Sequence, residues 1–168
     1  VEQAGTFELP EAQLDRFIFK LKVDFPGLAE LRTILDRTTT NQTSRAEAVC
    51  DGETLLAMGR MARDVLMKRD VQDYAIRLVL ATHPEREDAP EITRRYVRYG
   101  ASPRGAQALL LGARIRALLE GRENASVDDI RAIAMPALRH RIILNFEGEA
   151  EGVPPDSVIS SLLDSLPT

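Results

Sequence analysis

The sequence lacks tryptophan, holds a single cysteine and contains no long apolar run. Aromatic residues make up only 5% of its 168 residues, so a core has to be built from aliphatic side chains, which favours helices packed on helices. The single Cys50 cannot form an internal disulfide or a thiolate metal cluster, which is typical of a protein from a reducing compartment. No apolar run approaches the roughly 20 residues of a membrane-spanning helix. We therefore expect a cytoplasmic protein without a membrane span.

An excess of positive charge is also missing. The net charge is −4 and the isoelectric point is about 5.3. A general nucleic-acid binder needs a basic field that displaces counterions from phosphates, so nucleic acid is not an expected partner and any phosphate contact has to be local. A helical nucleic-acid-binding domain remains an alternative, with a basic patch formed by Arg94, Arg95, Arg98 and Arg104. The acidic balance and the lack of interleaved aromatic residues argue against it.

The residues that usually bind a nucleotide or a metal are absent as well. The chain contains no GxxxxGK[ST] loop to hold phosphates, and no acidic pair follows a hydrophobic strand where it could bind Mg²⁺. His83 and His140 lie far apart and have no metal-ligand or nucleophile partner at a usual spacing. We therefore predict no metal site, and we expect that this chain alone is not a working enzyme.

The first 26 residues predict a short helix followed by a strand. Pro10 and Glu11 suit a helix start, and this predicted helix covers 10–16. Apolar and polar residues then alternate over 17–25, which predicts a strand buried on one side. A lone strand needs neighbours for its backbone groups, so we expect an orphan strand whose sheet is completed by other sequence. The start at Val1, without Met, fits a fragment boundary.

The remaining sequence predicts a helical bundle, so the fold class is mainly α. Apolar residues recur at helical spacing in a series of segments, namely 27–41, 55–65, 70–82, 102–120, 126–138 and 154–166. We predict a charged loop over 84–99 and a short strand over 141–146. Asp70 and Ser126 are expected N-caps, Asp129 completes a capping box with Ser126, and Gly121 suits a helix C-cap.

The segment GASPRG, residues 100–105, carries the first candidate binding residue. Ser102 can cap the following helix, Pro103 fits its first position, and Arg104 lies in its first turn. A cation at this positive end of the helix is mildly unfavourable, by about 0.3–1 kcal/mol, whereas a bound anion would reverse the penalty. Arg104 therefore either contacts a phosphate or is a solvated surface residue.

The segment LPEAQLDRF, residues 9–17, carries the second candidate. Arg16 lies where the predicted helix meets the predicted strand. A guanidinium is permanently charged and forks onto phosphate oxygens, so Arg16 could act on a neighbouring subunit's phosphate as an arginine finger. The alternative is a surface ion pair with Asp15 or Glu11.

These two motifs resemble the MoxR family of AAA+ ATPases. The resemblance continues in order through SVDDIRAIAMPALRHRIILNFEGEAEG, residues 126–152, and VPPDSVISSLLDSLP, residues 153–167. It therefore spans nearly the whole chain. It implies the C-terminal part of such a protein: the end of the α/β core at 1–26, then the helical lid at 27–168.

The resemblance also implies roles for the two arginines. Arg16 is similar to the arginine finger that acts in trans on a neighbour's γ-phosphate. Arg104 is similar to the sensor 2 residue, which contacts the nucleotide of its own subunit, with Ser102 and Pro103 at the start of its helix. The intact protein would use ATP and Mg²⁺, assemble as a ring, commonly a hexamer, and remodel client proteins, among them proteins with von Willebrand factor A domains.

The sequence departs from the complete family pattern in one respect. It contains no Walker A, Walker B or sensor 1 segment, so the fragment alone is expected to bind neither ATP nor Mg²⁺. The alternative from another functional class is a helical adaptor that binds a protein partner and has no nucleotide role. The orphan strand argues against an adaptor, because a self-contained adaptor would complete its own sheet.

Overall fold

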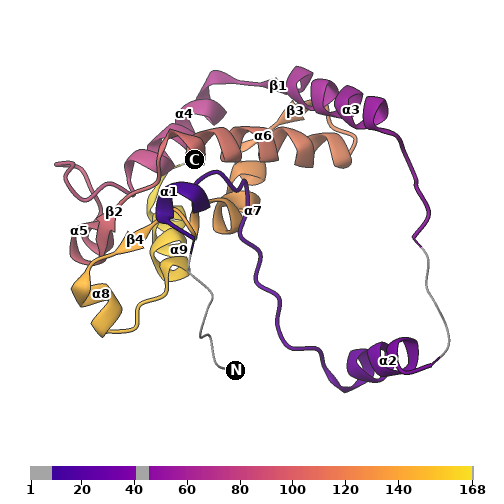
Figure 1. Ribbon diagram of the computed structural model, residues 1–168. Coiled ribbons are helices and arrows are strands. Elements are labelled where there is room, and N and C mark those ends of the chain that lie inside the picture. The colour runs from indigo at the N-terminus through magenta and orange to yellow at the C-terminus, as the bar shows by residue number, and fades with distance from the viewer. Residues whose placement is uncertain (1–8, 41–45, 168) are drawn as a thin grey trace. The chain divides into compact units, whose positions relative to one another are not determined.

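The computed structural model describes residues 9–40 and 46–167 of the chain. Among these described residues, those up to Lys20 and those from Met61 onward form one compact unit, and those within Leu21–Arg60 form a second. Figure 1 shows the course of the chain. We describe the two units separately and refer to the larger one as the helical unit.

The helical unit is built from helices and two very small sheets. Strand β1 (Leu66–Met67) pairs in parallel with β3 (Asn124–Ala125), and β2 (Val97–Tyr99) pairs antiparallel with β4 (Ile143–Leu144). Its helices are α1 (Glu11–Leu14), α4 (Arg69–Leu80), α5 (Glu91–Tyr96), α6 (Pro103–Leu119), α7 (Val127–Leu138), α8 (Phe146–Ala150) and α9 (Pro155–Ser165). The mainly helical class predicted from the sequence is confirmed.

The core of this unit lies among α4, α6, α7 and α9. These helices bury one apolar face each, and their largest fully buried side chains are Tyr74, Leu78, Leu109, Ile130, Leu138, Ile159 and Leu162. All but Tyr74 are aliphatic, as the scarcity of aromatic residues predicts. Small residues on α6, such as Ala113 and Ala117, are also fully buried, which lets the neighbouring helices approach closely.

The helix ends near the candidate motifs form as predicted. Ser102 caps α6 by accepting a hydrogen bond from the backbone N–H of Arg104 (3.1 Å). Gly121 ends the same helix with a φ of 70°, a value that favours glycine. Its N–H donates to Leu118, while Arg122 N–H donates to Ala117, which is the Schellman pattern.

The strand predicted over 17–25 does not form. No described strand pairs with it, and a strand without a ladder partner is not stable in water. The alternating apolar side chains are therefore not collectively buried: Phe17, Leu21, Val23 and Phe25 are exposed, and only Phe19 packs partly against the core of the helical unit. The short helix predicted over 10–16 is confirmed but is limited to the four residues of α1.

Two further expectations need correction. The predicted loop over 84–99 contains both α5 and β2. These elements depend on distant partners, because Thr93 Oγ1 donates to the buried Ala81 carbonyl (2.8 Å) and β2 pairs with β4. Asp70 lies in the first turn of α4, which Lys68 precedes as N-cap.

The second unit contains α2 (Leu28–Thr38) and the first part of α3 (Gly52–Asp64), which continues into the helical unit. No residue of α2 is buried, and only Ala62 is buried on α3. Both helices nevertheless have an apolar stripe, formed on α2 by Leu28, Ile34 and Leu35. This part of the chain therefore has no core of its own among the described residues.

Candidate functional site

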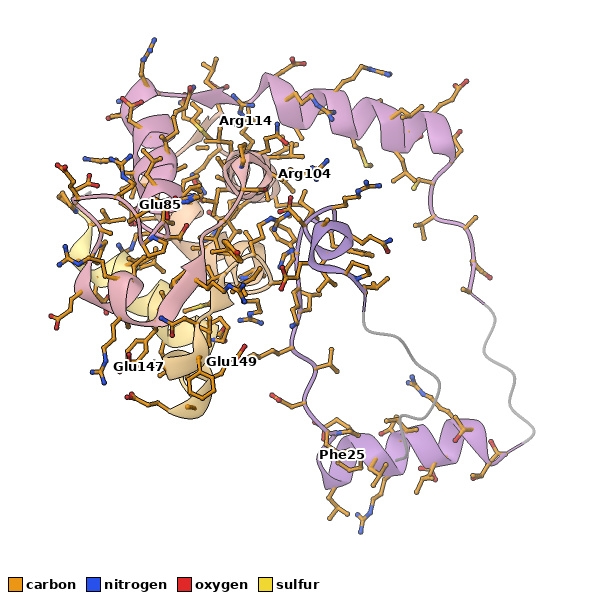
Figure 2. The ribbon with its side chains drawn as sticks, turned by 60° about the vertical axis from the view of Figure 1, so that its left-hand side comes forward. Phe25, Glu85, Arg104, Arg114, Glu147 and Glu149 are labelled. Atoms are coloured by element: carbon orange, nitrogen blue, oxygen red, sulfur yellow. The ribbon has the colours of Figure 1, made fainter. Side chains whose placement is uncertain are left out.

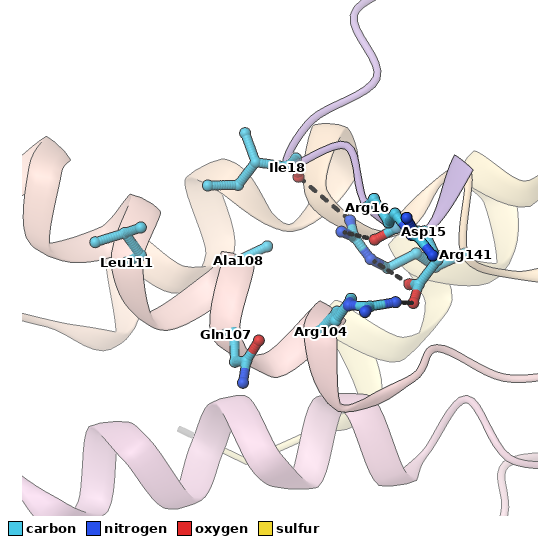
Figure 3. Close-up of a pocket in the computed structure, with 8 residues that line it drawn as sticks. All are labelled: Asp15, Arg16, Ile18, Arg104, Gln107, Ala108, Leu111 and Arg141. Carbon is cyan, nitrogen blue, oxygen red and sulfur yellow. Dashed lines mark hydrogen bonds and ion pairs between the residues drawn. The ribbon is translucent and has the colours of Figure 1, made fainter. Parts of the chain in front are cut away.

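Both candidate arginines line one pocket of the helical unit. The pocket has a volume of about 260 Å³ and lies where the turn after α1 meets the start of α6 and the end of α7 (Figure 3). Its lining comprises Asp15, Arg16, Ile18, Arg104, Gln107, Ala108, Leu111 and Arg141. One end of the pocket is therefore rich in charge, and the other carries aliphatic side chains.

Arg16 lies in the turn that follows α1, where its backbone N–H donates to Gln13 (3.2 Å). Its side chain is exposed. Within residues 9–40 and 46–167, no ion pair or hydrogen bond engages its guanidinium, so the surface pair with Asp15 or Glu11 does not form. Arg16 consequently presents an uncompensated charge and unused N–H donors at the pocket.

Arg104 lies in the first turn of α6 and is about half exposed. Its Nη1 donates to Asp15 Oδ2 over 3.3 Å, which is longer than a typical N–H···O hydrogen bond. No other side-chain bond of Arg104 is present in the described part of the chain. Arg104 therefore has most of its donors available for an anion.

Asp15 supplies the anion at the start of α6. Its carboxylate accepts hydrogen bonds from Ser102 Oγ (2.8 and 2.9 Å), from Arg104 and from Arg141 Nε (3.0 Å). Burial raises the pKa of Asp15, but the hydrogen bonds from Ser102 and Arg104 and the charge of Arg141 outweigh burial and lower it. Asp15 thus stays ionised and balances part of the positive charge at the pocket.

Arg141 is almost completely buried, with 2% of its side chain exposed. Its five N–H donors are all used: Nε bonds the Asp15 carboxylate, Nη2 bonds the carbonyls of Asp15 and Phe17, and Nη1 bonds those of Ile18 and Ala137. Burial lowers its pKa from the usual value, and the Asp15 charge opposes that effect. Arg141 has no donor left for a ligand.

Ser102 and Pro103 shape the start of α6. The Ser102 hydroxyl donates to Asp15 and accepts from Arg104 N–H, so both of its hydrogen-bonding functions are used within the chain. Pro103 occupies the first helical position, is exposed and does not belong to the pocket lining. In this structure the two residues fix the helix end that carries Arg104.

The histidines have structural contacts. His140 Nε2 donates to the Phe17 carbonyl (2.9 Å), and His83 Nε2 lies 3.1 Å from the Ala101 carbonyl. Burial lowers the pKa of His140, and the nearby charges of Arg141 and Lys20 add to this effect. Among the described residues, no group of three or more His, Cys, Asp or Glu side chains could hold a metal ion. Cys50 is exposed.

Other charged side chains of the helical unit are paired away from the pocket. Arg95 bonds Glu147 (2.6 Å) and Glu151 (2.8 Å), which lie on and just after α8. Figure 2 shows Glu147 and Glu149 well separated from Arg104.

The helices in the described ranges include none whose length and apolar character would let it span a membrane.

Of the residues that the sequence singles out, Arg16 and Arg104 line the pocket, whereas Ser102 bonds Asp15 beside it. The sequence did not indicate Asp15 or Arg141 as part of this pocket. Asp15 was considered only as a local partner of Arg16. It instead pairs with Arg141, which lies 126 positions further along the chain. No periodic pattern or short motif marks such a pair, because the contact exists only when the turn after α1 packs on the end of α7.

Known proteins resemble this chain over nearly its full length. The AAA lid domain family matches residues 89–162. The Chaperone MoxR1 of Mycobacterium tuberculosis is 31% identical over 99% of the chain and 44% of its own length, and Protein MoxR of Paracoccus denitrificans is 32% identical over 99% and 53%. A solved structure from Cytophaga hutchinsonii, described as a candidate ATPase, aligns with a TM-score of 0.90 and 32% identity over 99% of this chain and 51% of that one.

The chain spans about half the length of the curated relatives it matches. The match nevertheless includes both arginine motifs and the whole helical unit, because it covers 99% of the chain. These findings agree with one another. Residues 89–162 match an AAA lid domain, two relatives are MoxR proteins, and the structural neighbour has the same fold. The chain therefore belongs to the MoxR family of AAA+ ATPases, whose C-terminal part it matches.

Proposed function

We propose that this chain acts as the C-terminal portion of a MoxR-type ATPase that uses ATP hydrolysis to remodel or mature partner proteins. In this proposal, residues 1–26 end the α/β core and residues 27–168 form the helical lid. The observation that carries it is the pocket shared by Arg16 and Arg104, both of which have unused guanidinium donors. Planar guanidinium groups bind phosphate oxygens through paired hydrogen bonds, so the pair suits a nucleotide phosphate.

The proposed roles follow the resemblance. Arg16 acts as the arginine finger on the γ-phosphate bound by a neighbouring subunit, a role that contributes about 10³–10⁵ in rate in other nucleotide hydrolases. Arg104 acts as sensor 2, and Ser102 and Pro103 hold the helix start that positions it. The resemblance assigns Arg104 to the nucleotide of its own subunit. The shared pocket supports a second possibility, in which both arginines contact one phosphate group in trans.

ATP and Mg²⁺ would be held mainly by other parts of the intact protein. The described residues offer cationic donors that fit a phosphate but no carboxylate cluster that fits Mg²⁺. The magnesium ion would supply charge neutralisation to the phosphates. The residues of this chain would orient and stabilise the transferred phosphoryl group, and the isolated chain should not hydrolyse ATP.

The first test measures ATP turnover by the full-length protein with Arg16→Ala and Arg104→Ala. We expect Arg16→Ala to lower kcat by about 10³-fold while nucleotide affinity stays near wild type, because a finger acts mainly in the transition state. Arg104→Ala should weaken the dependence of lid position on the bound nucleotide. Arg98→Ala is the matched control, since Arg98 is exposed and stacks over Tyr99 outside the pocket. Wild-type turnover in Arg16→Ala would refute the proposed role.

A subunit-mixing experiment separates the two arrangements for Arg104. Arg104→Ala subunits are mixed with subunits whose phosphate-binding loop has been inactivated. If Arg104 acts in trans, an inactive-loop subunit supplies its arginine to an intact neighbouring loop, and activity returns on mixing. If Arg104 acts in cis, each subunit type stays defective and mixing restores nothing. The same mixture with Arg16→Ala should regain activity, because a finger acts between subunits.

Assembly and clients belong to the same proposal. We expect a ring, commonly a hexamer, in the cytoplasm, with client proteins that include von Willebrand factor A domain proteins. The competing function is a helical adaptor without a nucleotide role. A full-length protein that binds a client equally well with and without ATP, and hydrolyses none, would favour the adaptor.

A further inference from the structure

We propose that Arg141 and Asp15 are positioning residues that hold Arg16 and Arg104 as one preorganised pair. Neither residue touches the nucleotide in this account. Arg141 fixes the backbone on both sides of Arg16, and Asp15 connects that backbone to the helix start that carries Arg104. The inference rests on the proposed phosphate-binding role of the pocket and adds two residues to which the resemblance assigns no role.

The backbone around Arg16 is held from both sides. Arg141 Nη2 donates to the carbonyl of Asp15 (3.0 Å), just before Arg16, and to the carbonyl of Phe17 (2.7 Å), just after it. His140 Nε2 also donates to the Phe17 carbonyl (2.9 Å), and Arg141 Nη1 donates to the Ile18 carbonyl (3.2 Å). The segment has no regular secondary structure, so these side-chain bonds replace the ladder that a strand would provide. The Arg16 guanidinium itself has no hydrogen bond or ion pair among the described residues.

Asp15 connects the backbone segment that Arg141 holds to the second candidate arginine, Arg104. One carboxylate oxygen accepts from Arg141 Nε (3.0 Å), and the other accepts from Arg104 Nη1 (3.3 Å). Ser102 Oγ lies within hydrogen-bond distance of both oxygens, so its single O–H ties the carboxylate to the N-cap of α6. In Figure 3, the Asp15 carboxylate lies between the guanidinium groups of Arg104 and Arg141. A shift of the turn after α1 is therefore passed to Arg104 through a single carboxylate.

Stability alone does not require this arrangement. A buried ion pair usually stabilises a fold no better than apolar side chains of similar size, because both charges must leave water. An apolar residue at position 141 could fill the space, but it could not hold four carbonyls and a carboxylate in fixed directions. Lys offers three donors instead of five, so it could reproduce only part of the geometry. The arrangement fits a requirement for orientation.

The test compares Arg141→Met and Arg141→Lys with Arg131→Met in the full-length protein. Arg131 lies on α7, the helix that precedes Arg141, and is a matched control because it also holds distant groups, namely the Tyr74 hydroxyl (3.0 Å) and the Leu163 carbonyl, and lies outside the pocket. Each variant is characterised by kcat, KM for ATP, Tm and hydrogen exchange of the Lys20 amide. That amide donates to the Pro136 carbonyl (2.9 Å) and reports whether the segment stays docked on α7.

We expect Arg141→Met to lower kcat at least tenfold, to change KM less than threefold and to speed exchange of the Lys20 amide. Arg141→Lys should recover part of kcat. Arg131→Met should lower Tm while kcat stays within twofold of wild type. Wild-type kcat in Arg141→Met, or an equal loss in Arg131→Met at a matched change in Tm, would overturn the positioning role.

A second variant keeps the inference testable if Arg141→Met does not fold. Asp15→Asn preserves the size of the side chain and can still accept from Ser102, but it removes the charge that holds Arg104 and Arg141. We expect kcat to fall at least threefold with little change in KM, and an unchanged kcat would contradict the inference. Normal turnover in Arg16→Ala would be a different result. It would refute the proposed function itself, on which the positioning role depends.

Discussion

The three arginines of the pocket differ in how many of their donors the protein already uses. Arg141 is buried and fully bonded, Arg104 has one long contact with Asp15, and Arg16 has no partner among the described residues. A fully bonded guanidinium can organise a site but cannot bind a ligand, whereas a free one can bind without losing a protein contact. This difference separates the residue that positions from the residues that we expect to bind phosphate.

Gly100 is required by close packing just before the motif that carries Arg104. A Cβ at this position would lie 2.6 Å from the Thr82 carbonyl oxygen and 2.8 Å from its carbonyl carbon, so the backbone would have to move. The same backbone is held by the bond from Ala101 N–H to Thr82 Oγ1 (2.9 Å). We predict that Gly100→Ala lowers the free energy of unfolding by about 2 kcal/mol. The corresponding fall in Tm is roughly 4–8 °C, measurable by thermal unfolding.

Gly52→Ala is the control for this prediction. Nothing lies within 4 Å of a Cβ at Gly52, so the change should alter the free energy of unfolding by less than about 0.5 kcal/mol. If the two variants were equally stable, the backbone at Gly100 would accommodate a Cβ without loss of stability.

At the scale of single elements, helix ends decide where the site residues lie. The N-cap of α6 places Arg104 beside Asp15, and the end of α7 places Arg141 under the turn after α1. The start of α7 is fixed in turn by Asp129, whose side chain is only 1% exposed. Asp129 accepts hydrogen bonds from Arg122 Nη1 (2.8 Å), Ser126 N–H (2.8 Å) and Ser126 Oγ (3.0 Å).

Asp129 gives α7 a measurable dependence on pH. Burial raises its pKa, but the bonds from Arg122 and Ser126 prevail and lower it from 3.8 to about 2. A lowered pKa in the folded state means that the stabilisation is complete above pH 4 and is lost as the pH falls towards 2. We predict that Asp129→Asn lowers the free energy of unfolding by about 2 kcal/mol at pH 7. Urea unfolding should show that the difference from wild type disappears near pH 2.

Asp128→Asn serves as the matched change for this helix. Asp128 belongs to the same first turn but is exposed, so its loss should cost a few tenths of a kcal/mol through the helix dipole alone. A pH-independent difference between Asp129→Asn and wild type would mean that the ionised carboxylate does not stabilise the fold.

At the scale of the whole molecule, stability is unevenly distributed between the two units. The helical unit contains every fully buried large side chain that the structure describes, whereas α2 in the Leu21–Arg60 unit buries none. Helices without buried contacts open at low energy, because little apolar burial opposes the gain in chain entropy.

We therefore predict that trypsin first cleaves the isolated chain within the Leu21–Arg60 unit, with Arg32 and Arg37 on α2 as accessible sites. The helical unit from Met61 onward should persist as a protected product, identified by mass spectrometry of a short digestion. Arg116 and Arg131, on α6 and α7, should be cut much later, because these helices contain the core. Initial cleavage within α6 or α7 would contradict this order of stability.

The sequence alone determined most of the helices, their caps and the family. Helical periodicity, the Ser102 and Ser126 starts and the Gly121 end depend on neighbouring residues, so a linear pattern is sufficient to predict them. The motifs around Arg16 and Arg104 likewise lie within short segments. The strand predicted over 17–25 is not formed among the described residues for the complementary reason, because a strand depends on partners that the pattern itself does not contain.

Only the tertiary structure decided how the candidate residues meet. It brought Arg16 and Arg104 to one pocket and placed the buried Arg141 against Asp15, far along the sequence. The structure also contains α5 and β2 where the sequence predicted a loop over 84–99. Both elements depend on distant partners, because Thr93 of α5 donates to the Ala81 carbonyl and β2 pairs with β4. Pairing between distant segments is set by the packing of whole elements, and a local sequence pattern does not encode it.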